Sequence, residues 1–328
     1  MGRFSKITVP TIFTSENRHI RSVQYQNMKE TTHPSFLLSF DFEIGWGDVS
    51  NARWITRENN GVYQRLRPVL DRLLNEMDVL EFPATWATVG AMITAQEKLQ
   101  TCHLPSDAKK TVLKALDTAS ADTFDGRDLF EKTLNARTKH SYASHSYTHI
   151  PFNFPGVNQD YVSRDLKLSF DALSQYGVST DHFIFPENRE GYYDTLLESN
   201  IRVVRVAADT AHMSRPHYLL SALVGTPPPC KTDHHENGMT RHYGSMLFNM
   251  GAGRYHRLPF VYGRAIRGLN SACKNGTDLH VWAHPFNFAE SKVQLRAFIS
   301  FLRKVAAKRD AGEISIKTMQ EYQWSIQQ

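Results

Sequence analysis

Cysteine is scarce in this chain of 328 residues, which contains only three. Cys102, Cys230 and Cys273 lie far apart and form no C-x-x-C pair, so we expect neither a disulfide framework nor a cysteine zinc site. Long apolar runs are missing as well, because no stretch approaches the ~20 residues that span a bilayer and the N-terminal segment has no apolar signal-peptide core. We therefore expect a cytoplasmic protein, with contact to the inner membrane surface as an alternative.

Charge of one sign is not concentrated in long runs either. The chain has 38 Lys and Arg residues against 33 Asp and Glu, a net charge of +5. Residues 1–33 contain five basic and two acidic side chains, which account for +3 of this charge, and we expect them to form a basic arm that is solvated or touches an anionic membrane. No basic run has interleaved aromatic residues, so a nucleic-acid partner is not expected.

Apolar patterns alternate between short strands and longer helices through residues 35–310, within a domain that we expect to span residues 34–328. Hydrophobic residues make up 41% of the chain and charged residues 22%, which is typical of globular proteins. The patterns predict strands at 35–40, 84–89, 141–144, 182–185, 201–206 and 279–283 and helices at 61–80, 159–176, 191–199 and 291–309, with one or two further helices in 91–140 and an irregular insertion at about 207–256. This alternation predicts one α/β domain of barrel-like form.

Two histidines, His145 and His149, are four positions apart in the segment H-S-Y-T-H. If this segment is a helical turn, both rings lie on one face and are close enough to share a metal ion. Such a pair on its own is weak support for a site, but here it follows a predicted strand.

Acidic residues and a third histidine follow two other predicted strands. Asp41 and Glu43 come directly after the first strand, where one carboxylate could bind a metal and the other act as a base, or both could cap a helix or form salt bridges. His284 ends the last strand, where it is either a packed core residue or a general acid.

In this order, the residues resemble the polysaccharide deacetylase family, whose catalytic domain is the NodB-homology domain. The resemblance covers about residues 35–310. Ser39–Glu43 (S-F-D-F-E) is similar to the family's T-F-D-D-G, and Ala84–Gly90 is similar to its A-T-F-F-V-x-G. The family's H-[ST]-x-x-H is matched in full by residues 145–149, and His284 matches the histidine of its last strand.

Two motifs depart from the family pattern. Phe42 replaces the second aspartate of D-D, and Pro186–Arg189 (P-E-N-R) occupies the place of R-x-P-Y-G. These departures suggest a divergent branch that resembles the deacetylases of O-antigen and surface-polysaccharide biosynthesis.

The resemblance implies a distorted (β/α) barrel of about seven strands and a metal-dependent hydrolase that removes an acetyl group from an amino sugar of a cell-surface polysaccharide or its precursor. Its metal would be Zn²⁺, or alternatively Co²⁺, Mn²⁺ or Ni²⁺. The implied roles are these: metal ligands Glu43, His145 and His149, with Asp41 as the alternative carboxylate; base Asp41; acid His284; Arg189 to hold Asp41 ionised; and Trp46, Tyr192 and Trp282 to stack on the sugar.

Other interpretations remain open at the level of sequence. The altered motifs are also compatible with a catalytically inactive, sugar-binding relative in polysaccharide assembly, and the metal ligands with an amidohydrolase acting on a small amide. The His-rich segment Asp233–His242 could build a second metal site, although we expect it to be an exposed loop that lines the substrate cleft.

Overall fold

The computed structural model describes residues 33–208, 225–249 and 258–327. The predicted basic arm lies almost entirely outside the described residues, as do residues 209–224 and 250–257 of the predicted insertion. Within residues 33–328, the described residues belong to one unit.

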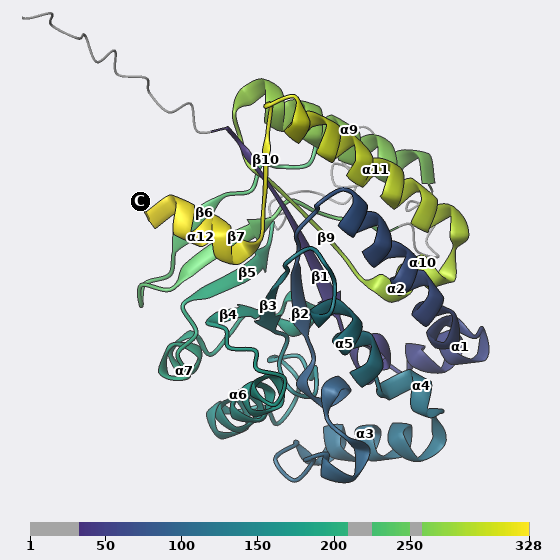
Figure 1. The fold of residues 1–328 in the computed structure, drawn as a ribbon. Helices are drawn as coiled ribbons and strands as arrows, with labels where there is room; N and C mark the ends of the chain where they lie inside the picture. The colour runs from purple at the N-terminus through teal and green to yellow at the C-terminus, as the bar shows by residue number, and fades with distance from the viewer. Residues whose placement is uncertain (1–32, 209–224, 250–257, 328) are drawn as a thin grey trace, which may run out of the picture. The chain divides into compact units, whose positions relative to one another are not determined.

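Six parallel strands form the centre of the fold, and all six coincide with predicted strands (Figure 1). In spatial order they are β5 (Val203–Ala207), β4 (His182–Ile184), β3 (Ser141–Ser144), β2 (Thr85–Thr88), β1 (Ser35–Phe42) and β9 (Leu279–Ala283).

One stretch of chain joins the two ends of this sheet. Strand β7 (Thr240–Gly244) pairs in parallel with β5, and after Ser245 the chain continues as β8 (Met246–Leu247), which pairs in parallel with β9. The amide of Ser245 donates to the carbonyl of His280 at 2.8 Å. The sheet therefore closes into a barrel of seven strand positions in the described part of the chain, which confirms the predicted fold class.

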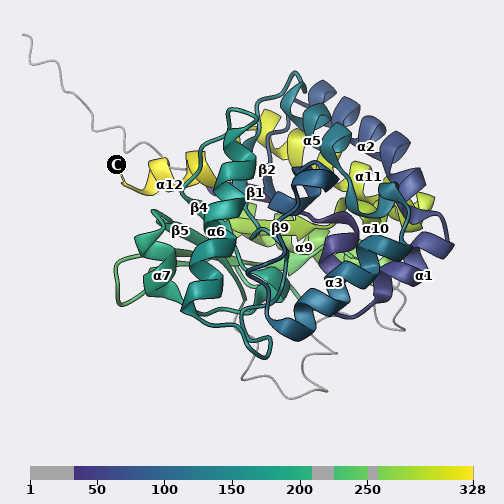
Figure 2. The same cartoon turned by 90° about the horizontal axis from the view of Figure 1, so that it is seen from below.

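Helices cover the outside of this barrel (Figure 2). Helix α2 (Val62–Val79) packs on the barrel through one apolar face. On this face Leu66, Leu70, Leu73 and Met77 recur at helical spacing, and all four are fully buried in the main apolar cluster. None of the described helices is long and apolar enough to cross a membrane.

The other helices and short strands follow in chain order. They are η1 (Ile44–Asp48), α1 (Arg53–Asn59), η2 (Gly90–Ile93), η3 (Gln96–Lys98), α3 (Ser106–Thr118), α4 (Ala121–Phe124), α5 (Arg127–Leu134), α6 (Gln159–Ser174), η4 (Pro186–Asn188), α7 (Tyr193–Glu198), β6 (Thr232–His234), α9 (Leu258–Asn275), α10 (Pro285–Glu290), α11 (Lys292–Asp310), β10 (Ser315–Lys317) and α12 (Met319–Gln327). Strand β10 pairs in parallel with the first part of β1, and β6 pairs antiparallel with β7.

The barrel interior is narrow and becomes polar toward the carboxyl ends of the strands. Side chains alternate along each strand, so every second residue points inward. A small inner cluster contains Leu37, Ala87, Ala143, Ile184 and Val203, and α12 closes it with Met319 and Tyr322. Two residues further along β1 and β5, the inward positions are Ser39 and Arg205. The next inward position on β1 is 41, and position 43, just past the end of the strand, continues the alternation, so both acidic side chains point into the barrel mouth.

The prediction of a loop at the His-rich segment is wrong. Residues 232–244 form the β6–β7 hairpin, in which burial alternates from Thr240 to Gly244. His242 points inward and its Nδ1 lies 3.0 Å from Thr232 Oγ1, whereas His235 stacks on Tyr193. These histidines therefore have separate partners and do not form a metal site.

The buried histidine of this hairpin makes stability depend on pH. Burial lowers the pKa of His242 from 6.5 to about 3. Below pH 6.5 the unfolded chain binds a proton on this ring and the folded protein does not. The contribution of His242 to the free energy of unfolding is therefore fully present above pH 6.5 and is lost as the pH falls. At pH 5 the burial of this uncharged ring should therefore lower the free energy of unfolding by about 2 kcal/mol relative to pH 7.

Urea unfolding at pH 7 and pH 5 checks this expectation. His242→Gln should reduce the acid-induced loss by about 2 kcal/mol, whereas His234→Gln, at an exposed histidine of the same hairpin, should leave it unchanged. An equal acid-induced loss in the wild type and in His242→Gln would contradict the assignment.

Candidate metal centre

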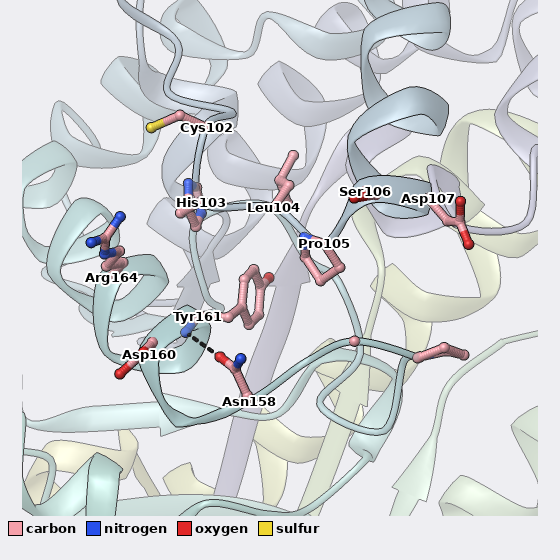
Figure 3. A pocket seen from close by; sticks show the side chains of 12 residues that line it. Cys102, His103, Leu104, Pro105, Ser106, Asp107, Asn158, Asp160, Tyr161 and Arg164 are labelled. Carbon is pink, nitrogen blue, oxygen red and sulfur yellow. Dashed lines mark hydrogen bonds between the residues drawn. The ribbon is translucent and has the colours of Figure 1, made fainter.

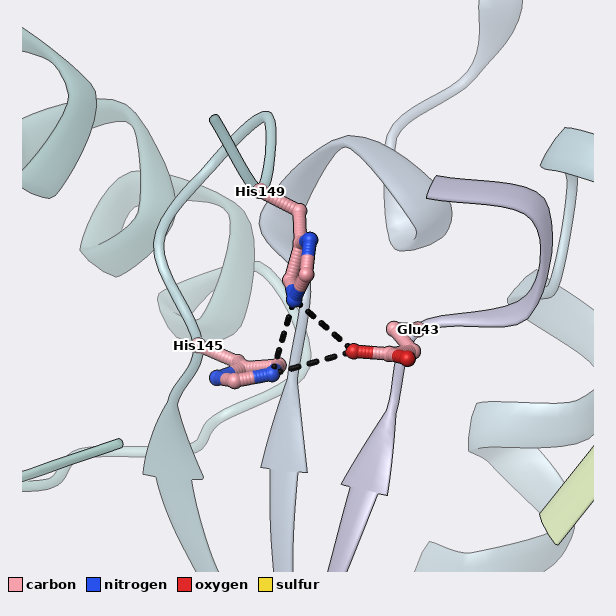
Figure 4. A group of neighbouring side chains, drawn as sticks. All are labelled: Glu43, His145 and His149. Carbon is pink, nitrogen blue, oxygen red and sulfur yellow. Dashed lines mark hydrogen bonds and ion pairs between the residues drawn. The ribbon is translucent and has the colours of Figure 1, made fainter. Parts of the chain in front are cut away.

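Three buried side chains meet at the carboxyl ends of β1 and β3 (Figure 4). Glu43 follows β1, and His145 and His149 follow β3. Glu43 Oε2 lies 3.1 Å from His145 Nε2 and 2.8 Å from His149 Nε2, and the two Nε2 atoms are 3.1 Å apart. The ligand atoms of all three residues lie within 4.8 Å of one another, close enough to hold one metal ion.

The two histidines do not lie on a helical turn, so that part of the prediction is wrong. His145 continues the β3 ladder, with its amide donating to Thr88 O at 3.0 Å. The chain then turns back through Ser146 and His149, which have positive φ angles of 62° and 59°. The amide of His149 donates to Ser146 Oγ at 2.9 Å, and this tight loop brings the second ring over the first.

The hydrogen bonding of His145 shows that the group suits a cation. Its Nδ1 lies 2.8 Å from the carbonyl oxygen of Ile184. Because a carbonyl only accepts, Nδ1 carries a proton, and Nε2 is the ring nitrogen directed at the Glu43 carboxylate. A proton on Nε2 can bridge it to the carboxylate, and a metal ion would take the place of that proton between the same two atoms. Metal-binding histidines commonly donate their other ring N–H to a carbonyl in this way.

The ionisation of the group agrees with this geometry. Burial alone raises the pKa of Glu43, but the charges of His149 and His284 and hydrogen bonds from His145 and His149 hold it well below its usual value. Burial lowers the pKa of His149, but the nearby Glu43 carboxylate more than offsets burial and raises it. Glu43 therefore carries a negative charge that is available to a cation.

Asp41 has a different partner. Arg205, fully buried on β5, donates to Asp41 Oδ1 at 2.6 Å and to Oδ2 at 2.8 Å. Burial alone raises the pKa of Asp41, but the charge and hydrogen bonds of Arg205 lower it below its usual value. Arg205 also donates to Ser39 Oγ at 3.0 Å and lies over the Trp282 ring, with its Cζ 4.5 Å from the ring centroid.

The prediction that Arg189 holds Asp41 is therefore wrong. Arg189 is exposed on the loop after β4, and the guanidinium that contacts Asp41 comes from the next strand. The sequence did contain a signal, because Arg205 interrupts the apolar run Val203-Val204-Arg205-Val206 of a predicted buried strand. A buried arginine nearly always has a carboxylate partner.

His284 completes the group from the end of β9. Its Nε2 lies 3.3 Å from Glu43 Oε1 and 3.8 Å from Asp41 Oδ2. Its Nδ1 lies 3.3 Å from Asn287 Nδ2 at the start of α10. Burial lowers the pKa of His284, although both carboxylates oppose this effect.

Only one of the three predicted stacking aromatics lies at this site. Trp282 lines the cavity beside His284. Trp46 is buried, donates its indole N–H to Phe124 O at 2.9 Å and cannot contact a sugar. Tyr192 packs against Phe152 and donates to Val157 O at 3.0 Å, so it is a packing residue away from the cavity.

The cavity has a volume of about 250 Å³. Asp41, Glu43, His145, His149 and His284 all line it, together with several residues that the sequence did not indicate. Its lining comprises Asp41, Glu43, Gly47, Asp48, Arg53, Arg57, His145, His149, Glu187, Asn188, Leu247, Asn249, Trp282, His284, Phe286 and Asn287. The additional residues come from η1, α1, η4, β8, α10 and the segment just after β8, whose approach to the barrel mouth depends on tertiary structure.

Comparisons with known proteins identify the fold. No protein-family model matches the chain, and no curated protein matches it in sequence. A structure from Mycobacterium smegmatis named as a candidate polysaccharide deacetylase matches with a TM-score of 0.58 and 14% identity, over 90% of each chain. A PuuE allantoinase structure matches with a TM-score of 0.57 and 11% identity, over 89% of this chain and 90% of that one. The fold is thus the (β/α) barrel of these structures.

The ion pair between Asp41 and Arg205 should contribute strongly to folding. Arg205→Met leaves a buried carboxylate without its partner, so the free energy of unfolding should fall by about 3–5 kcal/mol. Adding Asp41→Asn to this variant should restore part of the loss. Arg189→Met is the matched control and should change stability by less than about 0.5 kcal/mol, since Arg189 is exposed. Urea unfolding measures the free energy of unfolding of all three variants. Equal losses for Arg205→Met and Arg189→Met would contradict the assignment of Arg205 as the partner of Asp41.

Proposed function

We propose that this protein is a metal-dependent hydrolase that removes an acetyl group from an amino sugar of a polysaccharide or its precursor. The observation that carries the proposal is the buried Glu43–His145–His149 group, in which the bond of His145 Nδ1 to Ile184 O directs Nε2 toward Glu43. Two imidazoles and one carboxylate are a ligand set of catalytic zinc sites. Zn²⁺ is therefore our first choice, with Co²⁺, Mn²⁺ or Ni²⁺ as alternatives.

A divalent metal at this site would lower the pKa of a water molecule and polarise an acyl carbonyl. The residues around it have the complementary roles. Asp41 is the proposed base, and its two bonds to Arg205 keep the carboxylate ionised and fixed in orientation. Because Arg205 engages Asp41 while the histidines engage Glu43, the two carboxylates have separate tasks.

His284 is the proposed acid for the leaving nitrogen. It faces both carboxylates and lines the same cavity, so a proton accepted by Asp41 has a short path to it. Trp282, beside His284, is the proposed sugar-contacting aromatic. The contacts of Arg205 with Asp41, Ser39 and Trp282 make it a positioning residue for the base.

An amide other than an acetylated sugar is the second candidate substrate. The allantoinase structure matches almost as well as the deacetylase-like one, with TM-scores of 0.57 and 0.58. The choice of an acetylated sugar rests on the sequence motifs and on the name of the M. smegmatis structure. A role in O-antigen or surface-polysaccharide synthesis, at a cytoplasmic location, belongs to the same proposal.

Metal binding is the first test. The purified protein should bind one divalent ion per chain, and Glu43→Gln, His145→Ala and His149→Ala should each weaken Zn²⁺ binding by at least about 100-fold, because a three-ligand site loses one ligand. Glu187→Gln removes a carboxylate from the same cavity that is not in the group, and it should bind Zn²⁺ normally. Elemental analysis and calorimetric titration measure both quantities. A wild-type protein without stoichiometric metal would overturn the proposal.

Acetate release is the second test. Asp41→Asn and His284→Gln should lower release from N-acetylglucosamine oligomers by about 10²–10⁴-fold while metal stays bound, since each removes one proton-transfer group. Tyr192→Phe should leave the rate unchanged, because Tyr192 lies outside the cavity. Parallel assays with allantoin and with O-acetyl esters identify the bond that is cleaved. Turnover of allantoin alone would favour the second candidate.

A further inference from the structure

The loop that carries both histidines is held by a buried carboxylate that belongs to no recognised motif. Asp165 lies on α6 and is fully buried. We propose that Asp165 is a positioning residue for the metal centre, fixing residues 145–149 in the conformation in which the two rings converge. This inference rests on the proposed function, because it concerns the same centre.

Asp165 binds the loop through its backbone. Its Oδ2 accepts from the amide of Tyr147 at 2.7 Å, and its Oδ1 accepts from the amide of Thr148 at 3.2 Å. Oδ1 also accepts from Thr148 Oγ1 at 2.8 Å. The two amides lie between the two histidines in sequence, so the carboxylate holds the midpoint of the loop. Carboxylate–amide hydrogen bonds in a buried site are among the stronger ones in proteins.

The carbonyl groups of the same loop are held from the opposite direction. The amide of Gly90 donates to Ser146 O at 3.0 Å, and the amide of Ala91 donates to Tyr147 O at 2.8 Å. The loop is therefore bound by η2 through its carbonyls and by α6 through its amides. This double attachment offsets the cost of the positive φ angles at Ser146 and His149, which is of order 1–3 kcal/mol each for residues other than glycine.

Helix α6 is itself tightly seated against the barrel. Ser169 Oγ lies 2.9 Å from Ser144 Oγ, at the end of β3. A Cβ atom added to Gly90 would lie 2.9 Å from the Cα atom of Ser169, so glycine at this position permits the close approach of η2 and α6. Asp165, one helical turn before Ser169, is therefore presented to the loop from a fixed support.

Two further donors satisfy the remaining capacity of Asp165. His103 Nε2 and the Tyr161 hydroxyl each lie 3.2 Å from Oδ1. Burial raises the pKa of Tyr161 well above its usual value, so the phenol keeps its proton and donates. His103 stacks on Tyr161, and both line a cavity of about 630 Å³ next to α6 (Figure 3). All five partners of Asp165 are donors, which only a carboxylate can accept together.

Replacing Asp165 by asparagine turns an amide NH₂ toward these donors. The amides of Tyr147 and Thr148 then lose a charged acceptor, and the strained loop can relax. Because His145 and His149 depend on that loop for their convergence, metal affinity should fall although every ligand is present. Residues that orient metal ligands typically change affinity by about 10–100-fold.

The test compares Asp165→Asn with Asp171→Asn, which changes an exposed aspartate on the same helix. Co²⁺ is titrated into each metal-free protein and followed by calorimetry and by its visible absorption. We expect Asp165→Asn to bind Co²⁺ about 10–100-fold more weakly, with the same spectrum at saturation, and Asp171→Asn to bind like the wild type. Unchanged affinity in Asp165→Asn would overturn the inference.

Hydrogen exchange supplies a readout that does not depend on the metal. In Asp165→Asn the amides of residues 147–149 should exchange at least about 10-fold faster, while those of β1 and β2 keep their wild-type rates. If Asp165→Asn fails to fold, Thr148→Val removes one donor to Asp165 and should show the same two effects at smaller size. A wild-type protein that binds no metal would refute the proposed function, whereas unchanged exchange at residues 147–149 would refute the role of Asp165.

Discussion

Burying carboxylates is costly unless a partner compensates for their lost hydration, and this constraint organises the carboxyl end of the barrel. Three of the buried acids meet the requirement in different ways. Asp41 pairs with Arg205, Glu43 with two histidines, and Asp165 with backbone amides of the histidine loop. Each partner comes from a different part of the chain from its acid. The barrel closure, the seating of α6 and the convergence of the histidines therefore depend on one another.

The sequence was sufficient to predict the barrel and five of the residues that converge at its mouth, which are Asp41, Glu43, His145, His149 and His284. Strands β1 to β5 and β9 are short apolar runs, and alternation within them directs Asp41, Glu43 and His284 to one side. What it could not supply was the pairing between strands. Arg189 follows η4 on an exposed loop, whereas Arg205 lies within β5, where it pairs with Ile184 of β4 and its side chain points into the barrel.

Local geometry was the second limit of the sequence. A four-residue spacing fits a helical turn, yet the same spacing arises when a chain leaves a strand and folds back through residues with positive φ angles. The bonds that select the second conformation come from Gly90, Ala91 and Asp165, which are far away in sequence. Trp46 shows the same limit, since its position after an acidic motif indicates a cleft residue, whereas contact with Phe124 buries it.

Phe42 and Glu43 have different environments because side chains alternate along β1. Position 42 faces the outer apolar core, where its ring lies 5.1 Å from that of Trp86, and a carboxylate there would be buried without a partner. Position 43 faces the barrel mouth and the two histidines. The chain therefore has an aromatic residue in the core and an acid at the candidate centre at two successive positions. The presence of an acid at the candidate centre thus follows from the alternation of side chains along a single strand and the residue just beyond it.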